Sequence, residues 1–287
     1  MCRVIENSLR GKKRIISGDH PYLSNDDKES LMFYDETGAR IGRIVLFLHG
    51  FPFDHTLWLE TGKHLGNSWR LIFPDLRGFG QTNLPVSQVT TMMQFAQDTS
   101  DLIDRLDTSS HIVLCGLSMG GYVAMHFARY FGDRLAGLIL CDTKVRPDTE
   151  VLAQNRRQRA DTLPESGLAA LADAMLPNLL APQTGNDIRE NVRQMILRQP
   201  LAGVAAADRG MAERPDATGW LSAFSIPTLV ICGKHDNISP VGEMEQWTGQ
   251  IPHARFATIA NAGHLPPMEA PENFATVVKN FLGEIRE

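Results

Sequence analysis

The chain has 287 residues with a formal net charge of −5, and 43% of the residues are hydrophobic and 21% charged. These values fit one large α/β domain or a domain with an insertion, and they give no indication of a nucleic-acid partner. No apolar stretch approaches the roughly 20 residues of a membrane span, so no membrane partner is expected. Because the N-terminus lacks the apolar core of a signal peptide, we expect a cytoplasmic protein. We expect it to be a monomer or a homodimer.

Residues 1–30 are polar and irregular, which favours a partly disordered N-terminal segment. Residues 31–34 are a short strand candidate, and residues 36–38 carry a turn signal that would end it. The near-continuous apolar run at 43–48 is typical of a strand that is buried on both faces of a parallel sheet.

Helix and strand patterns then alternate along the chain. We expect helices at 56–65, 90–106 and 120–130, and strands at 69–73, 112–115 and 135–141. This alternation predicts a mostly parallel, doubly wound sheet over residues 31–143.

The alternation stops after Asp142. Residues 144–223 carry no strand signal and predict a helical cap over the carboxyl edge of the sheet. Within it we expect helices at 168–176 and 188–198, interrupted by Pro164, Pro177, Pro182 and Pro200. The α/β pattern resumes over 224–287, with strands at 226–232 and 254–259 and helices at 241–250 and 271–282.

The four cysteines do not indicate a disulfide framework. Cys115, Cys141 and Cys232 end apolar runs, as small buried thiols do, and Cys2 lies in the polar segment. Because no spacing fits a metal site, no metal is expected. No cofactor is expected either, since the chemistry inferred below needs none.

The apolar run at 112–115 leads into the pattern Gly-x-Ser-x-Gly, and a helical pattern follows. In a strand–turn–helix context, this pattern lifts the Ser118 hydroxyl out of a sharp turn. Gly116 and Gly120 are needed because a Cβ there would collide with the neighbouring strand or the helix. The turn also puts the Met119 N–H at a helix start, where it favours a developing anion.

Five motifs from residue 31 to the C-terminus carry a resemblance to α/β-hydrolase fold enzymes. Within that superfamily the chain resembles small bacterial esterases, 3-oxoadipate enol-lactonases and the cofactor-free haloperoxidase and perhydrolase group. The motifs are His49-Gly50-Phe51-Pro52, Asp75-Leu76-Arg77-Gly78-Phe79-Gly80, Gly116-Leu117-Ser118-Met119-Gly120-Gly121, Gly233-Lys234-His235-Asp236 and Gly263-His264.

The resemblance implies a catalytic triad in the order nucleophile, acid, histidine, which Ser118, Asp236 and His264 follow. His264 would take the proton of Ser118 and return it to the leaving alcohol, while Asp236 holds one tautomer of the imidazole. Each residue follows a predicted strand, at the edge where open α/β sheets bind ligands. The backbone N–H groups of Met119 and, by resemblance, Phe51 would form the oxyanion hole.

Some assignments stay open. Asp142 also ends a strand, and some members of the fold carry their acid there; Gly-x-x-Asp followed by a proline favours Asp236. We expect His49 to brace the oxyanion loop and Asp75 to brace loops together with Arg77.

The sequence thus predicts a serine hydrolase that cleaves a small carboxylic ester or lactone through an acyl-enzyme. The alternatives are a perhydrolase or haloperoxidase activity, suggested by Phe51-Pro52, and a hydrolase-like receptor with little turnover. An inward-pointing cap arginine would favour a substrate that carries a carboxylate. The candidates are Arg156, Arg157, Arg159, Arg193, Arg198, Arg209 and Arg214.

Overall fold

A seven-stranded sheet forms the centre of the molecule. The computed structural model describes residues 31–106 and 111–285, so the predicted N-terminal segment 1–30 lies outside the described residues. The strand order is β1-β3-β2-β4-β5-β6-β7; β1 pairs antiparallel with β3, and all the other pairs are parallel. The strands are β1 (Tyr34–Gly38), β2 (Ile44–Leu48), β3 (Arg70–Pro74), β4 (Ile112–Leu117), β5 (Leu135–Cys141), β6 (Thr228–Gly233) and β7 (Arg255–Ile259).

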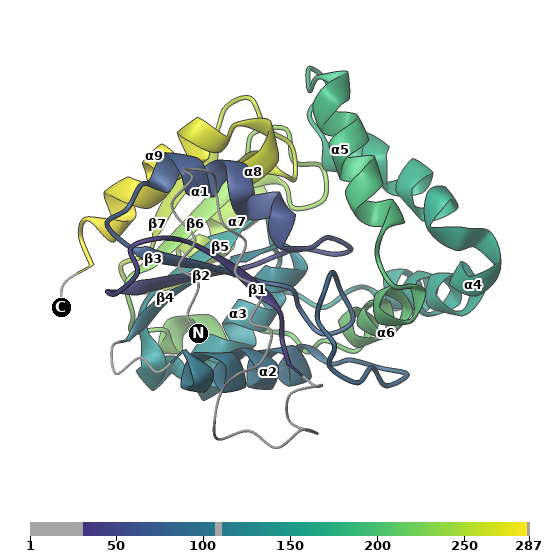
Figure 1. Cartoon of the computed structure of the whole chain (residues 1–287), viewed down its shortest axis with the longest axis horizontal. Helices are drawn as coiled ribbons and strands as arrows, with labels where there is room; N and C mark the ends of the chain where they lie inside the picture. Colours follow the sequence, from purple (N-terminus) through teal and green to yellow (C-terminus); the bar gives the residue numbers. More distant parts are fainter. Residues whose placement is uncertain (1–30, 107–110, 286–287) are drawn as a thin grey trace, which may run out of the picture.

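The central strands are almost continuously apolar because helices cover both faces of the sheet. Every residue of β2, β4 and β6 is buried. Figure 1 shows α1 and α9 on one face and α2 and α3 on the other. The predicted mostly parallel, doubly wound sheet is confirmed. The flanking helices are α1 (Leu59–Leu65), α2 (Met92–Arg105), α3 (Met119–Tyr130), α7 (Val241–Thr248), α8 (Pro266–Glu269) and α9 (Pro271–Leu282), with 3₁₀ turns η1 (His55–Trp58) and η2 (Gly132–Arg134).

A helical insertion, residues 144–223, separates β5 from β6. Figure 1 shows it standing to one side of the sheet, with α4 packed on α5 and α6. Gly167 has a φ of 74° and divides α4 into two helical segments. No helix in the described ranges is both long and apolar enough to cross a membrane. The insertion contains α4 (Glu150–Leu179), α5 (Asn186–Leu197), α6 (Leu201–Ala212) and η3 (Thr218–Ala223).

Three local predictions are wrong. The first strand runs from Tyr34 to Gly38 instead of covering 31–34, because its pairing with β3 begins at Tyr34 and extends to Gly38. Pro164 and Pro177 lie inside α4, and the break that precedes the predicted helix at 168–176 falls at Gly167 instead of Pro164. Packing on the neighbouring helices offsets the hydrogen bonds that the prolines remove. The helix α6 was missed because its small residues give little amphipathic contrast.

Candidate active site

Ser118 lies in a strained turn between β4 and α3. Its φ of 54° and ψ of −112° are unusual for a residue with a side chain. The turn is tight: a Cβ on Gly116 would lie 2.2 Å from the carbonyl oxygen of Gly120, and one on Gly120 would lie 2.3 Å from that of Leu48. The Ser118 N–H donates to the Cys141 carbonyl at 2.9 Å, which ties the turn to β5. The hydroxyl is therefore held above the carboxyl edge of the sheet.

A continuous chain of hydrogen bonds joins Ser118 to His264 and Asp236. The Oγ of Ser118 lies 2.8 Å from Nε2 of His264, and Nδ1 of His264 lies 2.8 Å from Oδ2 of Asp236. His264 and Asp236 are buried, whereas Ser118 is partly exposed. With Nδ1–H donating to the carboxylate, Nε2 can accept the serine proton.

Asp236 is held as a carboxylate. Its Oδ1 accepts the N–H groups of Ile238 at 2.7 Å and Ser239 at 3.1 Å. Burial alone would raise the pKa of Asp236, but the charge and hydrogen bond of His264 and these two N–H groups lower it. The ionised form is the one that can orient an imidazole and stabilise its positive charge.

Asp142, the alternative acid, lies beside this pair without a hydrogen bond to His264. Its Oδ1 accepts the Gly233 N–H at 2.7 Å, and Oδ2 is buried without a hydrogen-bond partner. Oxygens of Asp142 and Asp236 and a ring nitrogen of His264 lie within 4.8 Å of one another. Burial and the charge of Asp236 raise the pKa of Asp142 well above its usual range, which favours the neutral form of this carboxyl.

The loop after β2 lies directly beside the serine turn. A Cβ on Gly50 would come within 3.3 Å of the Ser118 Cβ, so the backbone of the next residue, Phe51, borders the nucleophile. The Phe51 N–H donates to no described residue. Met119 opens α3, so its N–H has no intrahelical acceptor. Both expected oxyanion donors are therefore free to bind a ligand.

His49 fixes this loop. Its Nδ1 lies 2.9 Å from the Gly50 carbonyl oxygen, and its Nε2 accepts the Leu76 N–H at 3.0 Å. Burial lowers the pKa of His49, which keeps the ring neutral and able to accept that N–H. These contacts match the bracing role expected of His49.

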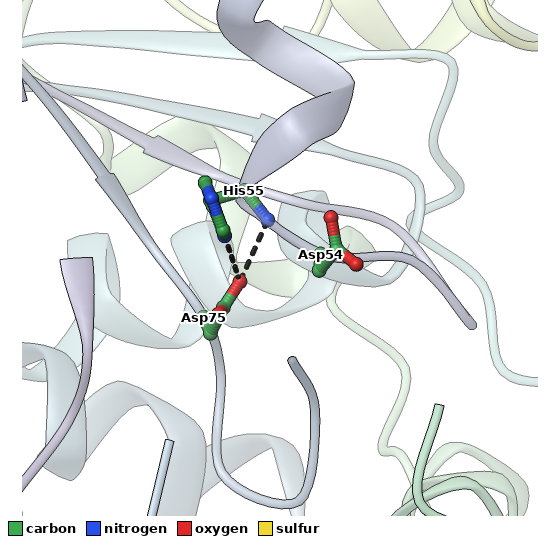
Figure 2. A group of neighbouring side chains, drawn as sticks. All are labelled: Asp54, His55 and Asp75. Atoms are coloured by element: carbon green, nitrogen blue, oxygen red, sulfur yellow. Dashed lines mark hydrogen bonds and ion pairs between the residues drawn. The ribbon is translucent and has the colours of Figure 1, made fainter. Parts of the chain in front are cut away.

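Asp75 braces the same region, but not with Arg77. Figure 2 shows one Asp75 oxygen accepting both the backbone N–H and Nδ1 of His55, at 2.7 and 2.8 Å. The other oxygen accepts the Gln81 N–H at 2.8 Å. Arg77 instead binds Asp98 on α2 through two hydrogen bonds. The predicted Asp75–Arg77 pair is wrong because the two side chains leave the loop in different directions.

Asp54 joins the oxyanion loop to the insertion. Its carboxylate accepts the Thr56 N–H, two N–H groups of Arg198 at 2.7 and 2.8 Å, and Nε2–H of Gln199 at 2.9 Å. Gln199 also accepts the Gly80 N–H at 2.9 Å. Burial alone would raise the pKa of Asp54, but the hydrogen bonds of Arg198 and Thr56 lower it to about 2. We call the contact of Asp54 with Arg198 and Gln199 the Asp54 clasp.

Sequence reasoning missed Glu269, which holds the His264 loop. Its Oε1 accepts the N–H groups of Gly263 at 2.8 Å and Leu265 at 3.2 Å, while Oε2 accepts the Ala181 N–H at 2.7 Å. The His264 N–H also donates to the carbonyl of Leu179 at 2.9 Å. A glutamate in a short proline-rich segment has no distinctive spacing, so no sequence signal marked it.

Two sets of acidic and histidine side chains are close enough to share a metal ion among the described residues. Hydrogen bonds account for both sets. In the first, His55 binds Asp75 (Figure 2). Asp54 binds the guanidinium of Arg198. In the second, Asp236 binds His264, and the raised pKa of Asp142 favours a protonated carboxyl, which is a weaker metal ligand than a carboxylate.

The chain is similar to proteins of known structure or function. The model of the α/β hydrolase fold family matches residues 43–271. A thermophilic esterase from Thermogutta terrifontis, solved with malate bound, is 45% identical with a TM-score of 0.86; the alignment covers 89% of this chain and 94% of that one.

Two curated relatives are more distant. 3-Oxoadipate enol-lactonase 1 of Acinetobacter baylyi is 27% identical over 246 residues, which are 84% of this chain and 89% of the lactonase. The putative 2-succinyl-6-hydroxy-2,4-cyclohexadiene-1-carboxylate synthase of Bacillus subtilis is 29% identical over 263 residues, 87% of this chain and 94% of that protein. Because the family model spans most of the sequence, this chain belongs to the α/β hydrolase fold family.

Proposed function

We propose that this protein is a serine hydrolase that cleaves small carboxylic esters or lactones through an acyl-enzyme. The observation that carries the proposal is the hydrogen-bonded chain from Ser118 through His264 to Asp236. The 45% identical esterase and the enol-lactonase support an ester or lactone as the substrate class. The malate in that esterase structure makes carboxylate-bearing esters part of the set to test.

The proposed mechanism begins when the Ser118 oxygen attacks the ester carbonyl and His264 Nε2 accepts its proton. Asp236 stabilises the imidazolium that forms. The N–H groups of Phe51 and Met119 bind the tetrahedral oxyanion. Collapse of the tetrahedral intermediate breaks the ester C–O bond, and His264 protonates the leaving alkoxide. Water, deprotonated by His264, then attacks the acyl-enzyme and releases the carboxylic acid and the free serine.

The test is hydrolysis of p-nitrophenyl acetate through p-nitrophenyl octanoate by the wild type and Ser118→Ala. We expect the variant to lose at least about 10³-fold in kcat, because no other group replaces the nucleophile. The matched control is Ser225→Ala, an exposed serine just before β6, at the opposite edge of the sheet. Undiminished turnover by a folded Ser118→Ala variant contradicts the proposal.

A further inference from the structure

A cluster of arginines and aspartates joins α4 to α6 in the insertion. Arg159 binds both oxygens of Asp208 at 2.7 Å, and Arg156 binds Asp208 at 3.1 Å and Asp148 at 2.6 Å. Arg214 completes the cluster by donating to Asp148 at 2.8 Å. We call these five residues the arginine cluster.

The arginine cluster carries an excess positive charge. Burial alone would raise the pKa of Asp148, but Arg214 and Arg156 lower it to about 2, so Asp148 is ionised. Each of the three guanidinium groups has an ion-pair partner, but they share only two carboxylates, so the positive charges outnumber the negative charges in the cluster. The whole chain is negative, at −5, so this excess is a local feature. A local positive charge of this kind attracts an anionic ligand.

The arginine cluster contacts the candidate active site at two aromatic rings. The guanidinium carbon of Arg159 lies 5.8 Å from the ring centroid of Phe51, an expected oxyanion residue. The guanidinium carbon of Arg214 lies 4.4 Å from the ring centroid of Tyr122, whose N–H donates to the Ser118 carbonyl at 3.2 Å. Two guanidinium groups of the cluster therefore lie against the rings of residues from the two segments that border Ser118, the loop after β2 and the first turn of α3.

Two of the three guanidinium groups keep donors for a ligand. Arg159 uses Nε and Nη2 for Asp208, and Arg156 uses Nε and Nη1, so Nη1 of Arg159 and Nη2 of Arg156 have no hydrogen bond within the described chain. The Arg159 side chain is 38% exposed, whereas that of Arg214 is 3% exposed. Asp208 holds Arg159 in a fixed orientation, which lowers the entropic cost of binding an anion.

We propose that Arg159, assisted by Arg156, binds a carboxylate of the substrate while Ser118 attacks the ester carbonyl. The preferred substrates are then half-esters of dicarboxylic acids or lactones that carry a free carboxylate. This inference rests on the proposed ester hydrolysis and specifies the substrate class. A guanidinium suits a carboxylate because its parallel N–H groups match the two oxygens.

The test compares monomethyl glutarate with dimethyl glutarate, two esters that differ at the carboxylate, by titration of the released acid. We expect the wild type to prefer the half-ester. In Arg159→Met, the ratio of kcat/KM for half-ester over diester falls by about tenfold or more, mainly through a higher KM. The control is Arg157→Met, which removes the same charge from α4 at a residue paired with the exposed Glu150. It leaves the ratio unchanged.

A second measurement needs no variant and covers the case in which Arg159→Met does not fold. Glutarate should competitively inhibit hydrolysis of p-nitrophenyl acetate by the wild type, and the neutral dimethyl ether of pentanediol should not. The inhibition should weaken from 0.05 to 0.5 M NaCl because salt screens a partly exposed ion pair.

Two outcomes separate the inference from the function it rests on. Equal or better hydrolysis of dimethyl glutarate, together with no inhibition by glutarate, overturns the carboxylate site and leaves the ester hydrolase standing. Failure to hydrolyse any ester of either set overturns the proposed function, and the substrate class with it.

Discussion

Around Ser118, backbone geometry sets the positions of the side chains. The serine turn fits only because Gly116 and Gly120 leave room for neighbouring carbonyl groups. Asp236 is fixed by backbone N–H groups of the loop that connects β6 to α7. Such positions follow from strand pairing and vary little as long as the sheet is intact.

In the insertion, ion pairs between charged side chains set the positions of the helices and of the residues they carry. Asp208 holds two arginines of α4, and the Asp54 clasp joins the insertion to the oxyanion loop. Ion pairs depend on pH and on salt, whereas the turn geometry does not. The candidate catalytic residues are therefore positioned by the backbone of the sheet, whereas the position of the insertion depends on ion pairs. The four changes that follow test that difference.

The largest effect is expected at the sheet edge. Asp236→Asn should lower kcat for p-nitrophenyl butyrate by about 10³-fold or more, because an amide neither stabilises the imidazolium nor favours the required tautomer. The free energy of unfolding should change much less than the activity. A loss below about tenfold, measured on folded protein, would mean that another group, such as Asp142, serves as the acid.

The Asp54 clasp should contribute acid-dependent stability. The folded pKa of about 2 lies below the ordinary value of 3.8, so the stabilisation is complete above about pH 4 and is lost as the pH falls through 2. We expect Asp54→Asn to cost about 2 kcal/mol of unfolding free energy at pH 7 in urea denaturation. The difference from the wild type should shrink below pH 4.

The exposed Asp101→Asn serves as the control for the clasp. Equal stability of the wild type and Asp54→Asn across this pH range would show that the clasp contributes nothing to folding.

Glu269 connects the two regions, because it accepts N–H groups from the insertion and from the His264 loop. In Glu269→Gln, the side-chain amide faces the Ala181 N–H, which loses its acceptor, and the His264 loop becomes less ordered. We expect kcat to fall by about tenfold, with a smaller change in KM, in p-nitrophenyl ester assays. Exposed Glu245→Gln on α7 should behave as wild type. An effect confined to KM would instead assign Glu269 to substrate binding.

The smallest catalytic effect is expected for Asp142→Asn. Asparagine keeps the acceptor for the Gly233 N–H and stays neutral, like the protonated acid, so activity should remain within about threefold. Because the folded pKa of Asp142 is raised, the folded protein retains a proton that the unfolded chain releases, so the contribution of Asp142 to stability falls as the pH rises above about 4. The variant should therefore lose less Tm between pH 5 and pH 9, measured by differential scanning calorimetry. An equal or larger loss of Tm contradicts a neutral Asp142.

Much of the fold could be predicted because parallel strands carry continuous apolar runs. The strand at 135–141 and the helix at 271–282 have the expected bounds, since burial and a proline at the helix start define them. The strand–turn–helix pattern around Ser118 was predictable because only glycine fits its close contacts.

The insertion was less predictable. Its helices bury small or charged residues through pairs such as Arg159 with Asp208, and no periodic pattern reveals partners that lie 49 residues apart. The partner of Arg77 and the role of Glu269 depend on loop paths that only the folded chain defines. The peroxide-dependent and receptor alternatives stay predictions, since they rest on Phe51-Pro52 and on ligands that no geometry identifies.

The three buried thiols of the sheet have a practical consequence. Cys115, Cys141 and Cys232 lie on β4, β5 and β6, whereas the sequence of the insertion contains no cysteine. Burial raises the pKa of Cys141 and of Cys232, so neither is a reactive thiolate in the folded protein. The rate at which a maleimide labels these thiols therefore reports how often the sheet itself opens. If the insertion moves away from the sheet to admit a substrate, the number of labelled thiols stays unchanged. One reagent therefore distinguishes motion of the insertion from unfolding of the sheet.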